Sequence, residues 1–261
     1  MTSFTELMAR LAPQGDDFSI EIPEDWMQGR TTYGGLTAAL CLQAVRRAFP
    51  TLPALRSAQI SFIGPAGGAV RLSPVLLRQG KSMTFAGADL VSEQGIATRA
   101  VFAFGAARES ALNRTFMAPP EMRPRETCEP YIPEGFGPPF ARHYESLLVK
   151  GARPLAGSSE YDHWIWARHK DKQATDDVAL LALADLPPAA VVPMFKTFGP
   201  ISSVTWGLNF LEAAPTTEAG WWLMQSRAEN AREGYSSQDM IVWNSAGEPV
   251  ITGRQTVAIF V

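Results

Sequence analysis

One pattern of secondary structure occurs twice along the 261-residue chain and limits the fold more than any other feature. Residues 36–49 and 176–186 are apolar on almost all sides, which predicts two helices that other elements must cover. Each is followed by four strand-like runs, at 57–63, 70–78, 83–91 and 96–104 in the first half and at 203–211, 221–228, 237–244 and 250–260 in the second. This order predicts an internal duplication.

Local signals support the predicted elements. Ala58, Ile60 and Phe62 alternate with polar residues, as expected of a strand with one buried face. The runs of the first half are separated by GPAGG, QGKS and SEQG, which are typical turn sequences. Thr175 or Asp176 can cap the second helix, and the prolines that follow residue 186 can end it. The sequence therefore predicts an α+β protein with two half-domains, each an antiparallel sheet curved around one helix.

Composition divides the chain into three predicted parts. Residues 109–155 are rich in proline and have little periodicity, so they are expected to connect an N-terminal half-domain, 1–108, to a C-terminal one, 156–261. The chain has 23 basic and 26 acidic residues, which gives no strong field to attract nucleic acid. Residues 1–18 contain no apolar core of signal-peptide length, and no run reaches about 18 apolar residues, so neither a secretory signal nor a membrane span is expected.

The cysteines and histidines argue against metal chemistry. Cys41 and Cys128 have the spacing of unpaired thiols, which favours a reducing, cytoplasmic environment. His143, His163 and His169 are the only histidines, and neither they nor the cysteines show the spacing of metal ligands. We therefore expect no metal and no other cofactor.

Several motifs together carry a resemblance to a known family. They are Trp26 with GRTTYGG, then LRSAQISFIGP, LRQGKS, DLVSEQG, WWL, EGYSSQ, VWNSAGEPV and GRQTV. In this order and spacing they resemble the acyl-CoA thioesterase II type of the double hotdog thioesterase-like superfamily, over nearly the whole chain. The resemblance implies a double hotdog fold and hydrolysis of an acyl-CoA to free acid and CoA, in fatty acid metabolism. It also implies a homo-oligomer, a dimer or larger, and no cofactor.

Tyr33, Gly34 and Gly35 directly precede the first predicted helix and are candidates for binding the substrate. The first amides of a helix lack intrahelical partners and carry partial positive charge, so they can receive an oxyanion. Glycine lets a substrate atom approach those amides closely. The thioester oxygen becomes negative in the transition state, which such donors stabilise. Alternatively, the two glycines only let the start of the helix pack closely.

In the family, an Asp, a Thr and a Gln of the C-terminal half activate a water molecule. The Gln corresponds to Gln255, midway along the last strand, although a buried amide could also serve only structure. Thr205 stands where the Asp is expected, and a hydroxyl cannot act as a base at neutral pH. The family Thr falls near Glu229 or Asn230. Glu229 could supply the missing carboxylate or be a surface residue, and Asp185, Ser236 and Ser237 are weaker candidates.

Three functions follow from this site. The first is an acyl-CoA thioesterase whose catalytic residues depart in part from the family pattern. The second is a double hotdog that binds an acyl-CoA or another acyl ligand with little or no turnover, which Thr205 in place of Asp favours. The third is hydration of an enoyl thioester, which requires a carboxylate and a histidine, and no histidine falls on a matching strand.

Overall fold

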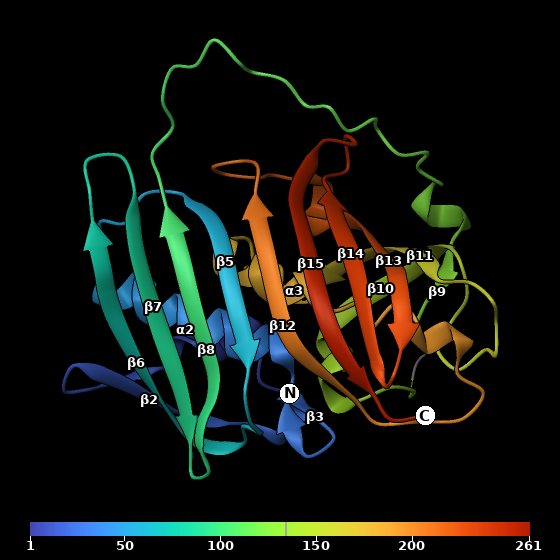
Figure 1. The fold of residues 1–261 in the computed structure, drawn as a ribbon, viewed down its shortest axis with the longest axis horizontal. Helices are drawn as coiled ribbons and strands as arrows, with labels where there is room; N and C mark the ends of the chain where they lie inside the picture. Colours follow the sequence, from blue (N-terminus) through green and yellow to red (C-terminus); the bar gives the residue numbers. More distant parts are fainter. Residues whose placement is uncertain (134) are drawn as a thin grey trace.

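The computed structural model describes residues 1–133 and 135–261. One continuous antiparallel sheet spans the molecule, with two long helices, α2 (Gly34–Ala48) and α3 (Asp177–Ala184), against one face (Figure 1). A short helix, α1 (Phe4–Ala9), precedes them. The sheet order is β1-β2-β6-β7-β8-β5-β12-β15-β14-β13-β11-β10-β9. The order in one half mirrors that in the other across the central pair β5 and β12, so the duplication is visible in the topology.

The eight predicted strands, which are β5 to β8 and β12 to β15, lie close to their predicted positions, and further strands accompany them. In the first half they are β1 (Ala12–Gln14), β2 (Asp17–Ile22), β5 (Leu55–Phe62), β6 (Gly68–Gln79), β7 (Thr84–Ser92) and β8 (Gly95–Phe104). In the second half they are β9 (Glu129–Pro130), β10 (Tyr144–Lys150), β11 (Asp162–His169), β12 (Ile201–Phe210), β13 (Trp222–Arg232), β14 (Tyr235–Trp243) and β15 (Pro249–Ile259). A separate pair is formed by β3 (Met27–Gln28) and β4 (Thr31–Thr32).

Short 3-10 helices complete the chain, at Glu24–Trp26, Arg125–Thr127, Pro139–His143, Val192–Met194 and Glu218–Gly220. No helix among the described residues is both long and apolar enough to cross a lipid bilayer.

The two central helices run antiparallel and touch along their length. At one end of the pair, the Tyr33 hydroxyl donates a hydrogen bond of 2.6 Å to the Ala182 carbonyl. At the other end, Arg46 forms an ion pair with Asp177. Asp176 caps α3 by accepting a hydrogen bond of 2.8 Å from the Ala179 amide, as predicted. As a result, the first turn of α2 lies beside the last turn of α3.

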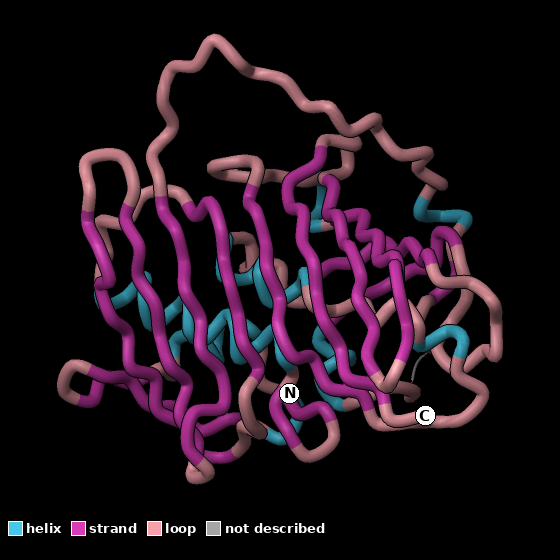
Figure 2. The backbone as a smooth tube through the Cα atoms, in the orientation of Figure 1, coloured by secondary structure: helices cyan, strands magenta, loops and turns pink. Residues whose placement is uncertain are grey.

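Each half has strands on the N-terminal side of its helix that the sequence did not predict. β2 precedes α2 and pairs with β6, and β11 precedes α3 and pairs with β13. β10 lies inside the segment 109–155 that was expected to be a connection, and it pairs with β11. Most of its side chains are half-buried, which explains why its sequence shows no clean alternation. The first part of the connection, as far as the 3-10 helix Arg125–Thr127, arches past the ends of the strands (Figure 2).

A bulge in β12 decides which side chains of the second half face the helices. The register between β12 and β15 shifts between Ser203 and Thr205. Beyond it, Trp206 pairs with Gln255, and both are buried. Successive side chains of a strand point to opposite faces, so Thr205 and Gly207 belong to the outer face of the sheet.

Candidate functional site

Asp185 ends α3 and places a carboxyl group at the junction of the two halves. Its Oδ1 accepts a hydrogen bond of 3.1 Å from Gln255 Nε2. Its Oδ2 lies so close to Gly34 that a Cβ there would approach it to 2.8 Å. The carboxyl group therefore lies between β15, which carries Gln255, and the first turn of α2, which begins at Gly34.

Gln255 reaches Asp185 from the inner face of β15. Its side chain is 5% exposed, and Nε2 also donates a hydrogen bond of 2.9 Å to Ser203 Oγ. Gln255 Oε1 accepts a hydrogen bond of 2.8 Å from Nε2 of Gln238, its partner on β14. Every polar atom of the Gln255 amide is therefore engaged, and Ser203 and Gln238 join the site although the sequence did not single them out.

The surroundings of Asp185 raise its pKa to about 7. The main cause is burial, which removes water from the charged form. The hydrogen bond from Gln255 and the backbone of Gly35 act in the opposite direction by stabilising the carboxylate. The group is thus divided between its two protonation states near neutral pH, which suits a general acid or base.

Aromatic side chains pack behind the carboxyl group. Tyr33 stacks on Phe140 with ring centroids 3.9 Å apart and meets the ring of Tyr144 edge-on at 6.0 Å. Burial raises the pKa of Tyr33 far above its usual range, and Tyr144 and Asp185 add to this. Tyr33 therefore stays protonated, and its hydroxyl serves the hydrogen bond to Ala182 that ties the two helices together.

The structure gives Gly34 and Gly35 a packing role and also places them next to the carboxyl group. A Cβ on Gly35 would collide with the Ala182 carbonyl oxygen and with the Tyr33 ring. A Cβ on Gly34 would press on Asp185 and on the Phe62 ring. Neither glycine donates its N–H to a backbone carbonyl within residues 1–133 and 135–261. The Gly35 backbone stabilises Asp185, so close packing and one free amide, that of Gly34, coexist at this helix start.

Thr205 lies away from Gln255. It is exposed on the outer face of β12, whereas Gln255 is buried on the inner face. The bulge beside it gives the inner position to Ser203, whose hydroxyl accepts the hydrogen bond from Gln255. Ser203, and not Thr205, is therefore the hydroxyl residue of β12 at this site. The sequence pointed to Thr205 because an alignment does not reveal the bulge.

Glu229 and Asn230 also lie apart from Gln255. Both are exposed near the end of β13. Glu229 forms an ion pair of 2.8 Å with Arg254 and accepts a hydrogen bond of 3.3 Å from Ser237. Because Arg254 and Gln255 are adjacent on β15, their side chains point to opposite faces. Glu229 is therefore a residue of the outer face, and the structure brings it to neither Gln255 nor Asp185.

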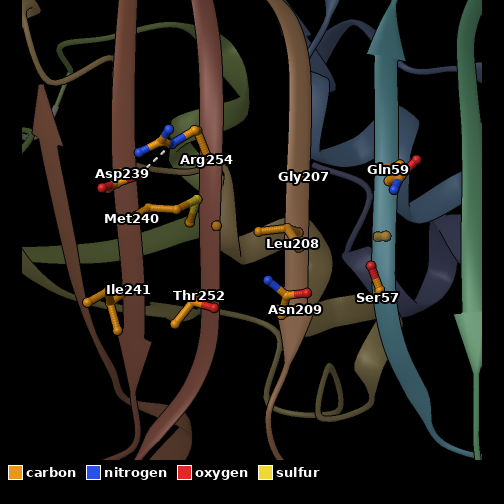
Figure 3. A pocket seen from close by; sticks show the side chains of 12 residues that line it. Ser57, Gln59, Gly207, Leu208, Asn209, Asp239, Met240, Ile241, Thr252 and Arg254 are labelled. Atoms are coloured by element: carbon orange, nitrogen blue, oxygen red, sulfur yellow. Dashed lines mark hydrogen bonds and ion pairs between the residues drawn. The ribbon is translucent and has the colours of Figure 1, made fainter. Parts of the chain in front are cut away.

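A shallow groove of about 520 Å³ crosses the outer face at the junction of the halves (Figure 3). Gly207 forms its floor, since a Cβ there would meet nothing within 4 Å, and Gln59 and Arg254 are its neighbours on β5 and β15. Arg254 is held by Asp239 at 2.9 Å. The groove contains neither Asp185 nor Gln255 and is separate from the candidate site.

Sequence signals for Asp185 and Gln238 exist in retrospect. Asp185 is the first charged residue after the apolar run 178–184, and only Leu186 separates it from two prolines. Gln238 has the same strand parity as Met240 and Val242, so a polar residue occurs where the pattern expects an apolar one. A buried polar residue of this kind needs hydrogen-bonding partners and so indicates a site.

The raised pKa of Asp185 predicts a pH-dependent cost in stability. The folded state holds this proton until about pH 7, whereas the unfolded chain loses it near pH 4. The stabilisation is complete below pH 4 and is lost as the pH rises through about 7. Asp185→Asn mimics the protonated form and cannot ionise. We expect its unfolding free energy, relative to that of wild type, to be about 4 kcal/mol higher at pH 8 than at pH 4. Urea unfolding of both proteins checks this, and a difference independent of pH contradicts it.

Comparison with known protein families finds a match for each half of the chain. Residues 22–105 match the family model described as acyl-CoA thioesterase N-terminal domain, and residues 118–259 match acyl-CoA thioesterase C-terminal domain. No protein of curated function matches the chain. The matches to the two models cover most of the chain.

Solved structures share the fold at low sequence identity. A hot dog fold protein of unknown function from Alicyclobacillus acidocaldarius is 23% identical, with 100% of this chain and 99% of that chain covered and a TM-score of 0.89. Acyl-CoA thioesterase II TesB2 from Mycobacterium marinum is 17% identical, with 97% of each chain covered and a TM-score of 0.75. The tesB protein of Mycobacterium avium subs paratuberculosis is 16% identical, with 98% and 99% covered and a TM-score of 0.77. The predicted double hotdog fold is confirmed, and the chain belongs to the acyl-CoA thioesterase family.

Proposed function

We propose that the protein hydrolyses an acyl-CoA thioester to free acid and CoA at Asp185, with Gln255 beside it. The observation that carries this proposal is a carboxyl group with a pKa of about 7, held by Gln255 and facing the first turn of a helix. The family supports the reaction class. The proposal places the base on α3, and not at position 205, where the family pattern has its Asp.

Asp185 acts as a general base in this proposal. The carboxylate takes a proton from water while the water oxygen attacks the thioester carbonyl carbon and the carbonyl oxygen becomes negative. When the intermediate collapses, the C–S bond breaks and the proton passes from Asp185 to the CoA sulfur. Proton transfer by a positioned side chain accounts for about 10² to 10⁴ in rate. Gln255 keeps the carboxylate oriented and favours its charged form.

The first turn of α2 supplies the donor for the negative oxygen. The Gly35 backbone already stabilises Asp185. This leaves the Gly34 N–H as the free donor at a helix end that carries partial positive charge. Gly34 is partly exposed, so a substrate carbonyl can approach it from outside. One donor of this type stabilises a transition state by about 3 kcal/mol.

A second candidate function is binding of an acyl ligand without turnover. The observation in its favour is Thr205, which removes the carboxylate from the family position. Hydration of an enoyl thioester is less favoured, because the three histidines have other partners. His143 contacts Asp25, and His169 contacts the Ala179 carbonyl. His163 stacks on Tyr131. None of the three is hydrogen-bonded to Asp185 or Gln255 in the described part of the chain.

A panel of acyl-CoA esters of different chain length separates hydrolysis from binding. We expect release of free thiol from at least one ester in excess of the buffer rate. Binding measured by calorimetry without thiol release, for every ester, contradicts hydrolysis and supports the binding function.

Two variants test the placement of the site. Gln255→Leu leaves Asp185 without its donor, so we expect kcat to fall by about 10²-fold. Thr205→Val is the matched control on the outer face, and we expect kcat within about twofold of wild type because the residue touches none of the proposed groups. Steady-state kinetics on the best ester measures both. Equal effects of the two substitutions contradict the placement.

We also propose that the protein works in the cytoplasm as a homo-oligomer. Both cysteines are unpaired, which suits a reducing compartment. Val75, Leu77 and Phe85 are exposed apolar residues on β6 and β7, and a second copy could cover them. Light scattering after gel filtration measures the assembly state, and a monomer at micromolar concentration contradicts this part of the proposal.

A further inference from the structure

Gln238 belongs to a chain of hydrogen bonds that ends at Asp185. Its Oε1 accepts a hydrogen bond of 2.7 Å from the Ala190 amide, and its Nε2 donates one of 2.8 Å to Gln255 Oε1. Gln255 Nε2 then donates to Asp185 Oδ1 at 3.1 Å and to Ser203 at 2.9 Å. Gln238 is 2% exposed, so no bulk water competes for these groups.

The Ala190 N–H group decides which atom of each side-chain amide donates and which accepts in this series of hydrogen bonds. A backbone N–H can only donate, so the Gln238 atom that faces Ala190 must be its oxygen. The amide nitrogen of Gln238 then faces Gln255, which must present its own oxygen. The Gln255 nitrogen is left for Asp185. Turning the Gln255 amide over would set two donors against each other at Gln238 and two acceptors against each other at Asp185.

The fixed direction favours one protonation state of Asp185. An N–H group stabilises a carboxylate by donating a hydrogen bond to it, but it cannot accept a hydrogen bond from the O–H group of a carboxylic acid. If Gln255 were free to turn over, its oxygen could accept that proton and stabilise the neutral acid. Gln238 prevents this rotation. It lies one strand beyond Gln255 and reaches Asp185 only through it.

We propose that Gln238 is a positioning residue that locks the Gln255 amide with its N–H group toward Asp185 and thereby favours the carboxylate form of Asp185, the form that can act as a base. The inference rests on the proposed function for its catalytic consequence. Its physical content, the coupling of Gln238 to the ionisation of Asp185, does not depend on which reaction the site performs.

The test replaces Gln238 with an apolar residue of similar length. In Gln238→Met the Gln255 amide can turn over, so we expect the midpoint of the pH dependence of kcat/KM to rise by about one pH unit, with the rate above about pH 9 within about threefold of wild type. Gln225→Met is the matched control, because Gln225 also donates to an aspartate, Asp162 at 2.7 Å, but away from the site. We expect its midpoint to equal that of wild type.

Carbon-13 NMR of the Asp185 carboxyl group gives a readout that is independent of turnover. We expect its titration midpoint to rise in Gln238→Met and to stay unchanged in Gln225→Met. An unchanged midpoint in Gln238→Met, or a fall in rate equal at every pH, overturns the inference. If the wild type hydrolyses no acyl-CoA, the proposed function fails, while the carboxyl titration still decides the role of Gln238.

The unmodified protein provides a second test in case Gln238→Met does not fold. Ionisation of Asp185 should polarise the whole chain of hydrogen bonds. We expect the side-chain amide signals of Gln255 and Gln238 and the backbone amide of Ala190 to shift with the same midpoint as the Asp185 carboxyl. Signals of Gln238 and Ala190 that do not move through this titration overturn the inference.

Discussion

Asp185→Asn is expected to lower kcat for acyl-CoA hydrolysis by about 10² to 10⁴-fold at neutral pH. Asparagine has the shape of the acid but cannot take a proton from water. Its amide can keep a contact with Gln255, whose nitrogen now lies 3.1 Å from the carboxyl oxygen. The loss should therefore be confined to kcat, with little change in the affinity for the substrate.

The control for this variant is Asp239→Asn. Asp239 is an exposed acid on the outer face that is paired with Arg254, and its loss should leave kcat within about twofold of wild type. Thermal unfolding shows whether each variant is folded. Retention of at least a third of the wild-type kcat in folded Asp185→Asn contradicts a role for Asp185 as the base.

Gly35→Ala is expected to cost much of the stability of the protein, because the added methyl group has no room between the two central helices. The new Cβ would collide with the backbone oxygen of Ala182 and lie 2.6 Å from both Cζ and the hydroxyl oxygen of Tyr33. A backbone atom cannot move aside as a flexible side chain can. Tyr33 would also have to give up its hydrogen bond to Ala182. We expect a loss of about 3 kcal/mol or more in unfolding free energy.

Gly207→Ala is the matched control for the added methyl group. A Cβ on Gly207 meets no atom within 4 Å, and the residue lies in a strand on the outer face. We expect its unfolding free energy to change by about 0.5 kcal/mol or less, or to rise slightly. Urea unfolding measures both variants. Equal costs for the two substitutions would show that α2 and α3 are not packed as closely as described.

The repeated order of one helix and four strands could be predicted from the sequence because apolar residues recur in these elements with a clear pattern. The apolar runs that became α2 and α3 and the alternating runs such as β5 were predicted within a few residues. β2, β10 and β11 were missed. β2 alternates in burial but is only six residues long, so its signal is short. β10 is half-buried on both faces and lacks the contrast between faces on which sequence prediction depends.

The candidate site was harder to predict because it depends on contacts between distant segments. Gln255 was recognised as a polar residue at a buried strand position. The bulge next to Thr205 directs its side chain to the outer face of the sheet. A sequence alignment carries no information about the bulge. Asp185 reaches the site only because α3 runs antiparallel to α2, which places the end of one helix at the start of the other. Helix packing of this kind leaves no local pattern.

The pH dependence of kcat/KM is the measurement that tests the proposed mechanism most directly. The assay follows thiol release from the best acyl-CoA ester between about pH 5 and pH 10 in wild type and in Asp185→Asn. If Asp185 is the base, the wild-type rate rises with an apparent pKa near its folded value of about 7 and then reaches a plateau. The residual rate of Asp185→Asn should lack this step and increase only with hydroxide. The same step near pH 7 in both proteins contradicts the assignment of the base to Asp185.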